Sequence, residues 1–306
     1  MTMQAYDLTI LPVPAARTAS DCQGWCFGLP PGIAPEQWPL DPTSGYPLQH
    51  AFTLLLPEDY RCHGPDLVAV SLFTSAMDHN DGGPNTEAPE IGEAMAAADA
   101  PNDPDLLPFW RAERTAHPRL HRMTDPLRIT HAAILLTRAE FDGELCRPPE
   151  MMPNPYRALL PPPEWMAKGS AAAYWNFMGD MRVVQDMFGT EPAQDLIENR
   201  ALSWTPRAHD PNAGRKPYDE FLHEPTDYIQ PFFVRHDSNG EESYESHSWT
   251  EGHALNHIGG TMRSLQQTPD FSPYYVEFDE ELGGFNFGGG NAQFDFLNFK
   301  LEWACG

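Results

Sequence analysis

Proline and glycine interrupt this chain so often that only short elements can form along most of its length. The 306 residues include 32 prolines and 23 glycines. Proline lacks an amide donor and glycine favours turns, so both residues end strands and helices. Segments 50–56, 66–73, 128–137, 274–279 and 292–296 are rich in β-forming residues, and we predict a strand in each. We expect the second of these strands to be half exposed, because small and polar residues alternate with its large apolar ones.

Helices are expected mainly in the middle of the chain. Apolar residues recur at three- and four-residue spacing from 174 to 188, which predicts a helix with one buried face. A shorter helix is predicted to begin near Pro192. Two other short helices are predicted at 89–98 and 106–116. In each segment a proline stands near the start, and alanines or other good helix formers follow it. Prolines crowd residues 147–163 so closely that we interpret this segment as a connector.

Two stretches of the chain resemble each other. The first begins at Phe27-Gly28-Leu29-Pro30 and ends in the strand that contains Val70-Ser71-Leu72, and the second begins at Ile258-Gly259-Gly260-Thr261 and ends at Phe294-Asp295-Phe296. In each stretch a glycine-containing turn leads to a strand, a loop and then an alternating strand. The pattern predicts an internal β-rich duplication, with two related mixed or antiparallel sheet units arranged around a pseudo-twofold axis.

The expected fold class is therefore α+β, with a helical, proline-rich middle between the two sheet units. We divide the chain into an N-terminal β-rich half with an acidic loop (1–146), a proline-rich connector with helices (147–215) and a C-terminal β-rich half (216–306). At this length, two lobes and one compact domain are both allowed.

The turn and packing motifs of the two stretches are similar to those of a known family. They are Gly28-Leu29-Pro30, Gln37-Trp38-Pro39 and Gly45-Tyr46-Pro47-Leu48 near the start, and Gly259-Gly260 with the run from Phe287 to Phe296 near the end. This set resembles the YwqG-like family of bacterial proteins of unknown function. The chain departs from that pattern in two places. Gly290-Asn291 replaces the usual Gly-Asp, and the single Gly28 replaces the usual pair of glycines. The resemblance implies a compact α+β fold, and some members of the family are suspected immunity proteins for secreted toxins.

The charge of the chain restricts its partners. Acidic residues outnumber basic ones by 44 to 19, for a formal net charge of -25. Such a field repels nucleic acid and anionic lipid, so we expect neither a nucleic-acid nor a membrane partner. The same field attracts a basic protein and speeds its encounter. The acidic residues gather in three tracts, from which we predict these partner-binding residues: Asp78, Asp81, Glu87, Glu90, Glu241, Glu242, Glu245, Asp279, Glu280 and Glu281.

The chain shows no secretory signal at its start and no apolar stretch long enough to cross a bilayer. Its five cysteines are scattered and odd in number, which is typical of reduced thiols. We therefore expect a cytoplasmic protein.

Enzymatic chemistry has weak support in the sequence. His247, Glu251, His253 and His257 could supply metal ligands, but neighbouring glycines disfavour the helix that would align them. The glycine-rich run 283–291 lacks the Lys and Ser/Thr of a phosphate loop, and we interpret it as a hairpin loop with positive φ angles. No nucleophile motif is present. We predict no catalytic residue, no cofactor and no bound metal.

These observations predict a non-enzymatic, immunity-type protein that binds and neutralises a cognate toxin effector. The toxin is expected to be basic, and a nuclease is the simplest such case. Two alternatives stay open: a metal-dependent hydrolase that uses the His247 to His257 cluster, and an adaptor or chaperone that delivers an effector to a secretion machine.

Overall fold

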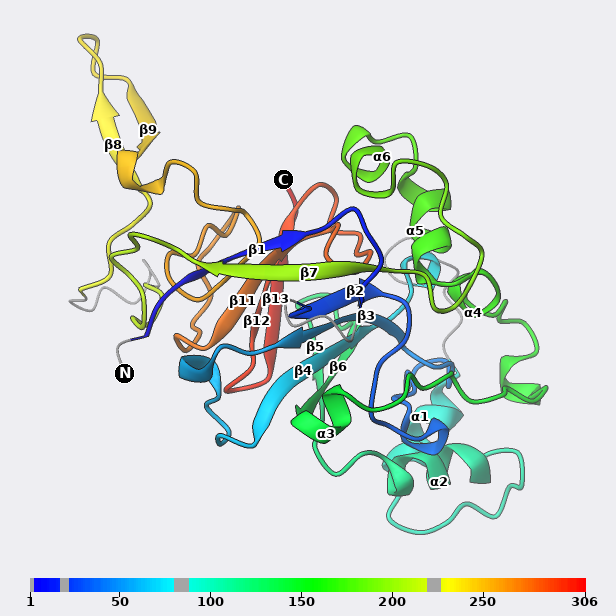
Figure 1. Cartoon of the computed structure of the whole chain (residues 1–306). Helices are drawn as coiled ribbons and strands as arrows, with labels where there is room; N and C mark the ends of the chain where they lie inside the picture. The colour runs from blue at the N-terminus through cyan, green and yellow to red at the C-terminus, as the bar shows by residue number, and fades with distance from the viewer. Residues whose placement is uncertain (1–2, 17–21, 80–87, 219–226) are drawn as a thin grey trace.

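The computed structural model describes residues 3–16, 22–79, 88–218 and 227–306. Eleven of the strands in these ranges form one sheet, in the order β13-β12-β11-β10-β1-β7-β2-β3-β4-β6-β5, and two form a separate hairpin, β8-β9 (Figure 1). The strands are β1 (Tyr6–Ile10), β2 (Gly24–Phe27), β3 (Gln49–Leu55), β4 (Leu67–Thr74), β5 (Leu120–Thr124), β6 (Thr130–Thr137), β7 (Asn199–Pro206), β8 (Phe232–His236), β9 (Glu242–Ser246), β10 (His257–Ile258), β11 (Tyr275–Asp279), β12 (Asn291–Asp295) and β13 (Lys300–Ala304).

Helices make a minor contribution to the described residues. They are α1 (Pro89–Ala96), α2 (Leu107–Thr115), α3 (Arg138–Phe141), α4 (Trp165–Lys168), α5 (Ser170–Met178) and α6 (Arg182–Phe188). Figure 1 shows α4, α5 and α6 near one end of the sheet, with α1 and α2 below them in this view. The fold is therefore mostly antiparallel sheet with few helices. This content of strands and helices is compatible with the predicted α+β class. No helix within the described ranges is both long enough and apolar enough to span a membrane.

All five predicted strands are present, as β3, β4, β6, β11 and β12, and the two short predicted helices are present as α1 and α2. The prediction that β4 is half exposed is wrong. Val70 and Leu72 belong to a hydrophobic cluster on one face of the sheet, while Ala69 and Phe73 pack in a second cluster on the other face. That second cluster is covered by α3 and α4, which is why both faces of β4 are buried.

The single helix predicted for 174–188 is wrong in its extent. Helix α5 ends before Gly179, where an added Cβ would lie 2.3 Å from the carbonyl oxygen of Trp175. Met181 is extended, and α6 begins after it. The helix predicted near Pro192 is absent from the segment between α6 and β7, which passes close to Gly169: a Cβ there would lie 2.2 Å from the carbonyl oxygen of Asp195.

The N-terminal strand pairs with segments from far along the chain. Tyr6 of β1 pairs with Ile258 of β10, and Ile10 pairs with Leu202 of β7. The predicted boundaries at 146/147 and 215/216 thus fall between strands of one continuous sheet. The strand sets β2-β3-β4 and β10-β11-β12 are each consecutive and antiparallel, as the two similar stretches require. Their origin by duplication stays a prediction.

A buried polar junction fixes β1 beside the C-terminal strands. The Arg207 guanidinium lies 2.6 Å from an Asp7 oxygen in β1 and 2.9 Å from an oxygen of Asp210. Asp210 also accepts hydrogen bonds from the amide of Thr261 at 2.9 Å and from its hydroxyl at 2.7 Å. Burial alone would raise the pKa of Asp210, but the hydrogen bonds from Thr261, the amide of Asn212 and Arg207 outweigh it and lower the pKa.

Candidate partner-binding site

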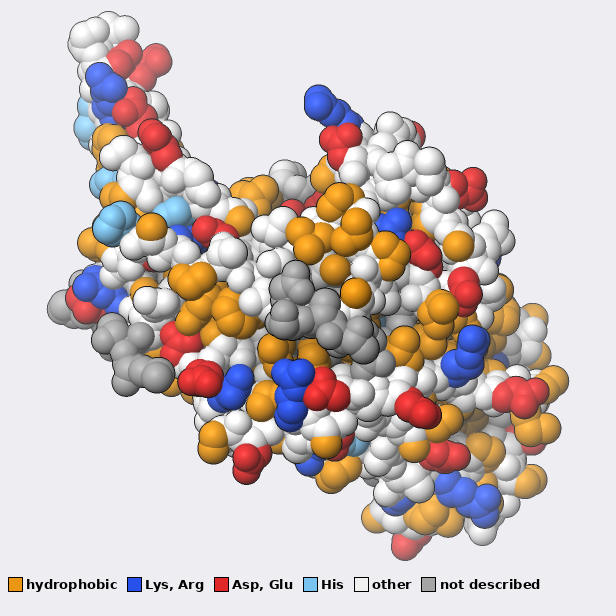
Figure 2. All heavy atoms as spheres, viewed as in Figure 1, with side chains coloured by type: hydrophobic (Ala, Val, Ile, Leu, Met, Phe, Trp, Pro, Cys, Tyr) orange, Lys and Arg blue, Asp and Glu red, His pale blue; other side chains and the backbone are white. Residues whose placement is uncertain are grey.

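The most exposed element of the described chain is the β8–β9 hairpin, residues 232–246. It projects away from the body of the molecule (Figures 1 and 2), and all of its positions are exposed except that of Glu245, which is partly covered. A two-stranded hairpin that stands alone is only marginally stable in water. Its apolar side chains therefore add little to the stability of the free protein and remain available for another surface.

Local sequence explains why the chain turns at the tip of the hairpin. The Asp237 carboxylate accepts hydrogen bonds from the amides of Asn239 and Glu241, both at 2.8 Å. Gly240 has a φ of 82°, the left-handed conformation that a short hairpin loop needs and that glycine adopts without strain. Asp237 is thus engaged in shaping the turn, and the carboxylates beside it carry the negative charge of the tip.

One face of the hairpin, which we call the apolar face, consists of Phe232, Val234 and Tyr244. Val234 and Tyr244 are paired across the two strands, and Phe232 precedes Val234 by two residues, so the three side chains project to the same side. Their exposed fractions are 43%, 44% and 73%. Contiguous exposed aromatic and branched side chains of this kind mark interaction surfaces in proteins.

The opposite face carries a row of rings that leads down to the body of the molecule. The ring of Phe233 lies 4.9 Å from that of His247, which stacks on Trp249 at 5.6 Å, and Trp249 lies 6.0 Å from His253. On the same face Arg235 donates to Glu245 at 2.9 Å. This row holds the base of the hairpin, and it uses two of the histidines that suggested a metal site.

The histidines and Glu251 do not converge on one point. His253 contacts the carbonyl oxygen of His209 at 3.0 Å through Nε2, whereas His257 is fully buried 3.1 Å from a Glu277 oxygen. Among the described residues, no group of three or more His, Cys, Asp or Glu side chains is placed to hold a metal ion. The described residues therefore contain no set of metal ligands that a metal-dependent hydrolase could use.

The three acidic tracts lie in different places. Glu241 and Glu242 are exposed at the tip of the hairpin. Glu90 is exposed in the first turn of α1, and Asp78 accepts a hydrogen bond from the amide of Glu164 at 2.9 Å. Figure 1 shows the hairpin and α1 at opposite ends of the molecule, so these two tracts do not form one surface. The predicted residues Asp81 and Glu87 lie outside the described residues.

The third tract faces inward. Glu280 is only 3% exposed, and its carboxylate accepts hydrogen bonds from the amides of Phe287 and Gly289. Asp279 accepts a hydrogen bond from Asn256 at 3.1 Å. Glu280 therefore shapes the loop between β11 and β12 and presents no carboxylate to a partner. The loop contains positive φ angles at Gly283, as expected for a hairpin connection and not for a phosphate cradle.

Glu281 makes this tract sensitive to pH. Burial and the nearby charge of Asp279 raise its pKa from 4.5 to about 8. Between those values the folded state keeps a proton that the unfolded state releases, so stability falls as the pH rises through this window. We expect Glu281→Gln to leave stability nearly unchanged at about pH 5 and to increase it by about 2 kcal/mol at about pH 9, a value reduced for partial exposure. Urea unfolding at both pH values checks this, and an equal effect at both would contradict it.

The sequence contains a local signal for this hairpin that the predicted strands above do not include. Asn239-Gly240 is a dipeptide that strongly favours hairpin turns, and strand-forming residues flank it on both sides. The charges of Glu241, Glu242 and Glu245 predict a polar surface tract, whereas the β-forming residues between and before them predict the two strands.

A scan against protein-family models, a search of curated proteins and a search of solved structures each found no match to this chain. The resemblance to the YwqG-like family therefore rests on the quoted motifs and stays a prediction.

Proposed function

We propose that this protein is a cytoplasmic, immunity-type binder that neutralises a basic toxin domain, and that the β8–β9 hairpin is the element that contacts it. The observation that carries the proposal is the projecting hairpin, which combines an exposed apolar face with acidic side chains at its tip.

Shape and charge support this proposal together. Each strand of the hairpin has five residues, so the hairpin reaches about 17 Å from its base, enough to enter a cleft. It carries four carboxylates, those of Asp237, Glu241, Glu242 and Glu245, against the single guanidinium of Arg235. The cleft of a nuclease is lined with cations that bind phosphate, and an acidic, aromatic-bearing hairpin is complementary to such a cleft. Blocking that cleft would neutralise the toxin without any catalytic step.

Neutralising the tip tests the electrostatic part of the proposal. We expect Glu241→Gln with Glu242→Gln to weaken binding of the captured partner by about three- to tenfold at low salt, mostly through slower association. The difference should shrink at about 1 M salt, where charges are screened over a few ångströms. The matched control is Asp180→Asn with Glu191→Gln, which changes the net charge equally at exposed positions outside the hairpin.

The experiment begins by capturing the partner from a lysate of the cells that encode this chain, after which surface plasmon resonance compares the two double variants. Equal affinities for both would contradict a role for the tip. The purified partner is then assayed for toxicity or nuclease activity with and without the protein. Loss of that activity supports an immunity protein, whereas a bound but fully active partner would identify an adaptor instead.

A further inference from the structure

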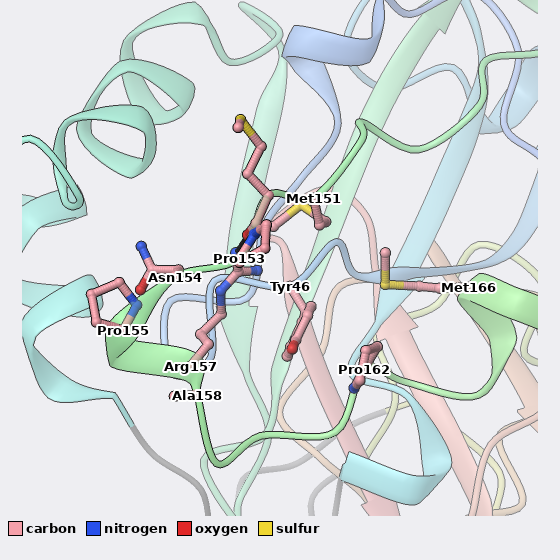
Figure 3. Close-up of a pocket in the computed structure, with 10 residues that line it drawn as sticks. Tyr46, Met151, Pro153, Asn154, Pro155, Arg157, Ala158, Pro162 and Met166 are labelled. Carbon is pink, nitrogen blue, oxygen red and sulfur yellow. Dashed lines mark hydrogen bonds between the residues drawn. The ribbon is translucent and has the colours of Figure 1, made fainter.

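A second candidate site lies beside the proline-rich segment, which supplies most of the residues that line it (Figure 3). It is an open pocket of about 660 Å³, within the range typical of small-molecule sites. Most of its lining surface is apolar. The lining residues are Tyr46, Met151, Met152, Pro153, Asn154, Pro155, Arg157, Ala158, Pro162 and Met166.

The one charged side chain in this lining is Arg157, which ends a short 3-10 helix (Pro155–Arg157) and is 6% exposed. Its guanidinium donates to the carbonyl oxygen of Met152 at 2.9 Å and, at 3.5 Å, to that of Gly45. Its buried Nε has no hydrogen-bond partner. A guanidinium has five N–H donors, so several remain unused.

Arg157 also forms no ion pair with any carboxylate in the described ranges. In a chain with 44 acidic residues this is informative, because a buried charge without a counter-charge costs stability. Two aromatic rings lie against the guanidinium, that of Tyr46 at 4.6 Å and that of Phe109 at 5.2 Å. These rings exclude water from it and fix its orientation, as in sites that are preorganised for an anion.

We propose that this pocket binds a small organic monocarboxylate, with the carboxylate on Arg157 and the apolar body against the methionines and prolines. The single unpaired cation is complementary to a ligand with one negative charge. The electrostatic field of a protein with a net charge of -25 disfavours ligands that carry more than one negative charge. Arginine pairs with carboxylates through two parallel hydrogen bonds. Met151, Met152 and Met166 are flexible and polarisable, so they adapt to apolar ligands of varied shape.

The competing interpretation is that Arg157 serves only to anchor the segment 151–158 through the carbonyl oxygens it contacts. Both interpretations expect Arg157→Met to reduce stability. They differ in whether the protein binds apolar carboxylates at all, and in whether an added charge at the mouth of the pocket matters.

The test uses the full chain and a series of straight-chain carboxylates from butanoate to decanoate, with benzoate as a flat alternative. Binding is followed by ¹H–¹³C NMR of the methionine methyl groups and by calorimetry. We expect at least one of these acids to shift the signals of Met151 and Met166, and the alcohol of equal length to bind more weakly. Arg157→Met should reduce the affinity for the acid by about ten- to hundredfold and leave that for the alcohol nearly unchanged.

A second variant keeps the test valid if Arg157→Met fails to fold. Ala158→Glu places a negative charge at the exposed rim of the pocket, whereas Leu159→Glu places it on the next residue, which is exposed and does not line the pocket. We expect the first to reduce acid binding at least fivefold more than the second. The alkyl phosphate of equal length should bind more weakly than the acid. Absence of any methyl shift across the series, equal losses in both glutamate variants, or preference for the phosphate would overturn the proposal.

Discussion

Removing the β8–β9 hairpin is expected to abolish partner binding while leaving the rest of the protein intact. In this variant, two glycines replace residues 232–246 and join Pro231 to His247. We expect the affinity for the captured partner to fall by at least about a hundredfold, because the exposed aromatic residues of a small contact element carry most of the binding free energy. The melting temperature should change by less than about 2 °C.

The structure explains why the deletion should be tolerated. The amide of His247 donates to the carbonyl oxygen of Pro231 at 3.0 Å, so the two ends of the deleted segment already lie side by side. No residue of the hairpin belongs to the described hydrophobic clusters. The long loop therefore closes into a short turn without removing any core contact.

A milder variant separates the apolar face from the charge of the tip. Val234→Ser with Tyr244→Ser keeps all carboxylates and the turn, and we expect it to lose about tenfold or more in affinity through faster dissociation. Thermal unfolding followed by circular dichroism, together with surface plasmon resonance, checks both variants. A hairpin-deleted protein that still captures the same partner with unchanged affinity would exclude the hairpin as the contact element.

The largest effect on stability is expected at the buried junction around Arg207. We expect Arg207→Met to destabilise the fold by about 3–5 kcal/mol, because it leaves the carboxylates of Asp7 and Asp210 beside each other without their cation. Urea unfolding at neutral pH measures this. The matched control is Arg182→Met, which removes an exposed pair with Asp186 and should have no measurable effect.

The pH dependence distinguishes loss of charge from loss of packing. In the native protein the pKa of Asp210 is lowered, so its ionised form stabilises the fold above its unfolded pKa, and this contribution is lost as the pH falls through the folded pKa. Without Arg207 the pKa of Asp210 rises, and the carboxyl takes up a proton at mildly acid pH. The difference between the two proteins should therefore be smaller at about pH 4 than at neutral pH. A difference independent of pH would indicate a packing defect instead.

The sequence allowed the local elements to be predicted because each depends on neighbouring residues. Strands such as β3 and β4 lie between prolines and glycines, and α1 begins at Pro89, so composition within a short window was sufficient. The apolar spacing continues past Gly179 and so predicts one helix, whereas α5 ends at Gly179, a residue type that often terminates helices.

The candidate sites depended on information of two kinds. The dipeptide Asn239-Gly240 is a local turn signal that predicts the hairpin, and the exposure of Glu241 and Glu242 follows from their place beside that turn. The burial of Glu280 depends on the course of the loop that follows it, whose amides it accepts from, and the environment of Arg157 depends on the distant rings of Tyr46 and Phe109. Neither the course of a loop nor a contact between distant segments is encoded in spacing or composition.

The place of β1 in the sheet affects how the chain is made. Its partners, β7 and β10, leave the ribosome long after β1 itself, since Tyr6 pairs with Ile258. At about 5–20 residues per second, the delay is roughly 10–50 s. During that time β2, β3, β4, β6 and β5 can pair with one another in that spatial order, while β1, which buries Tyr6 and Leu8 in the folded sheet, lacks its partner strands. Nascent chains of this protein should therefore depend on chaperones that hold β1 until β7 and β10 have been synthesised.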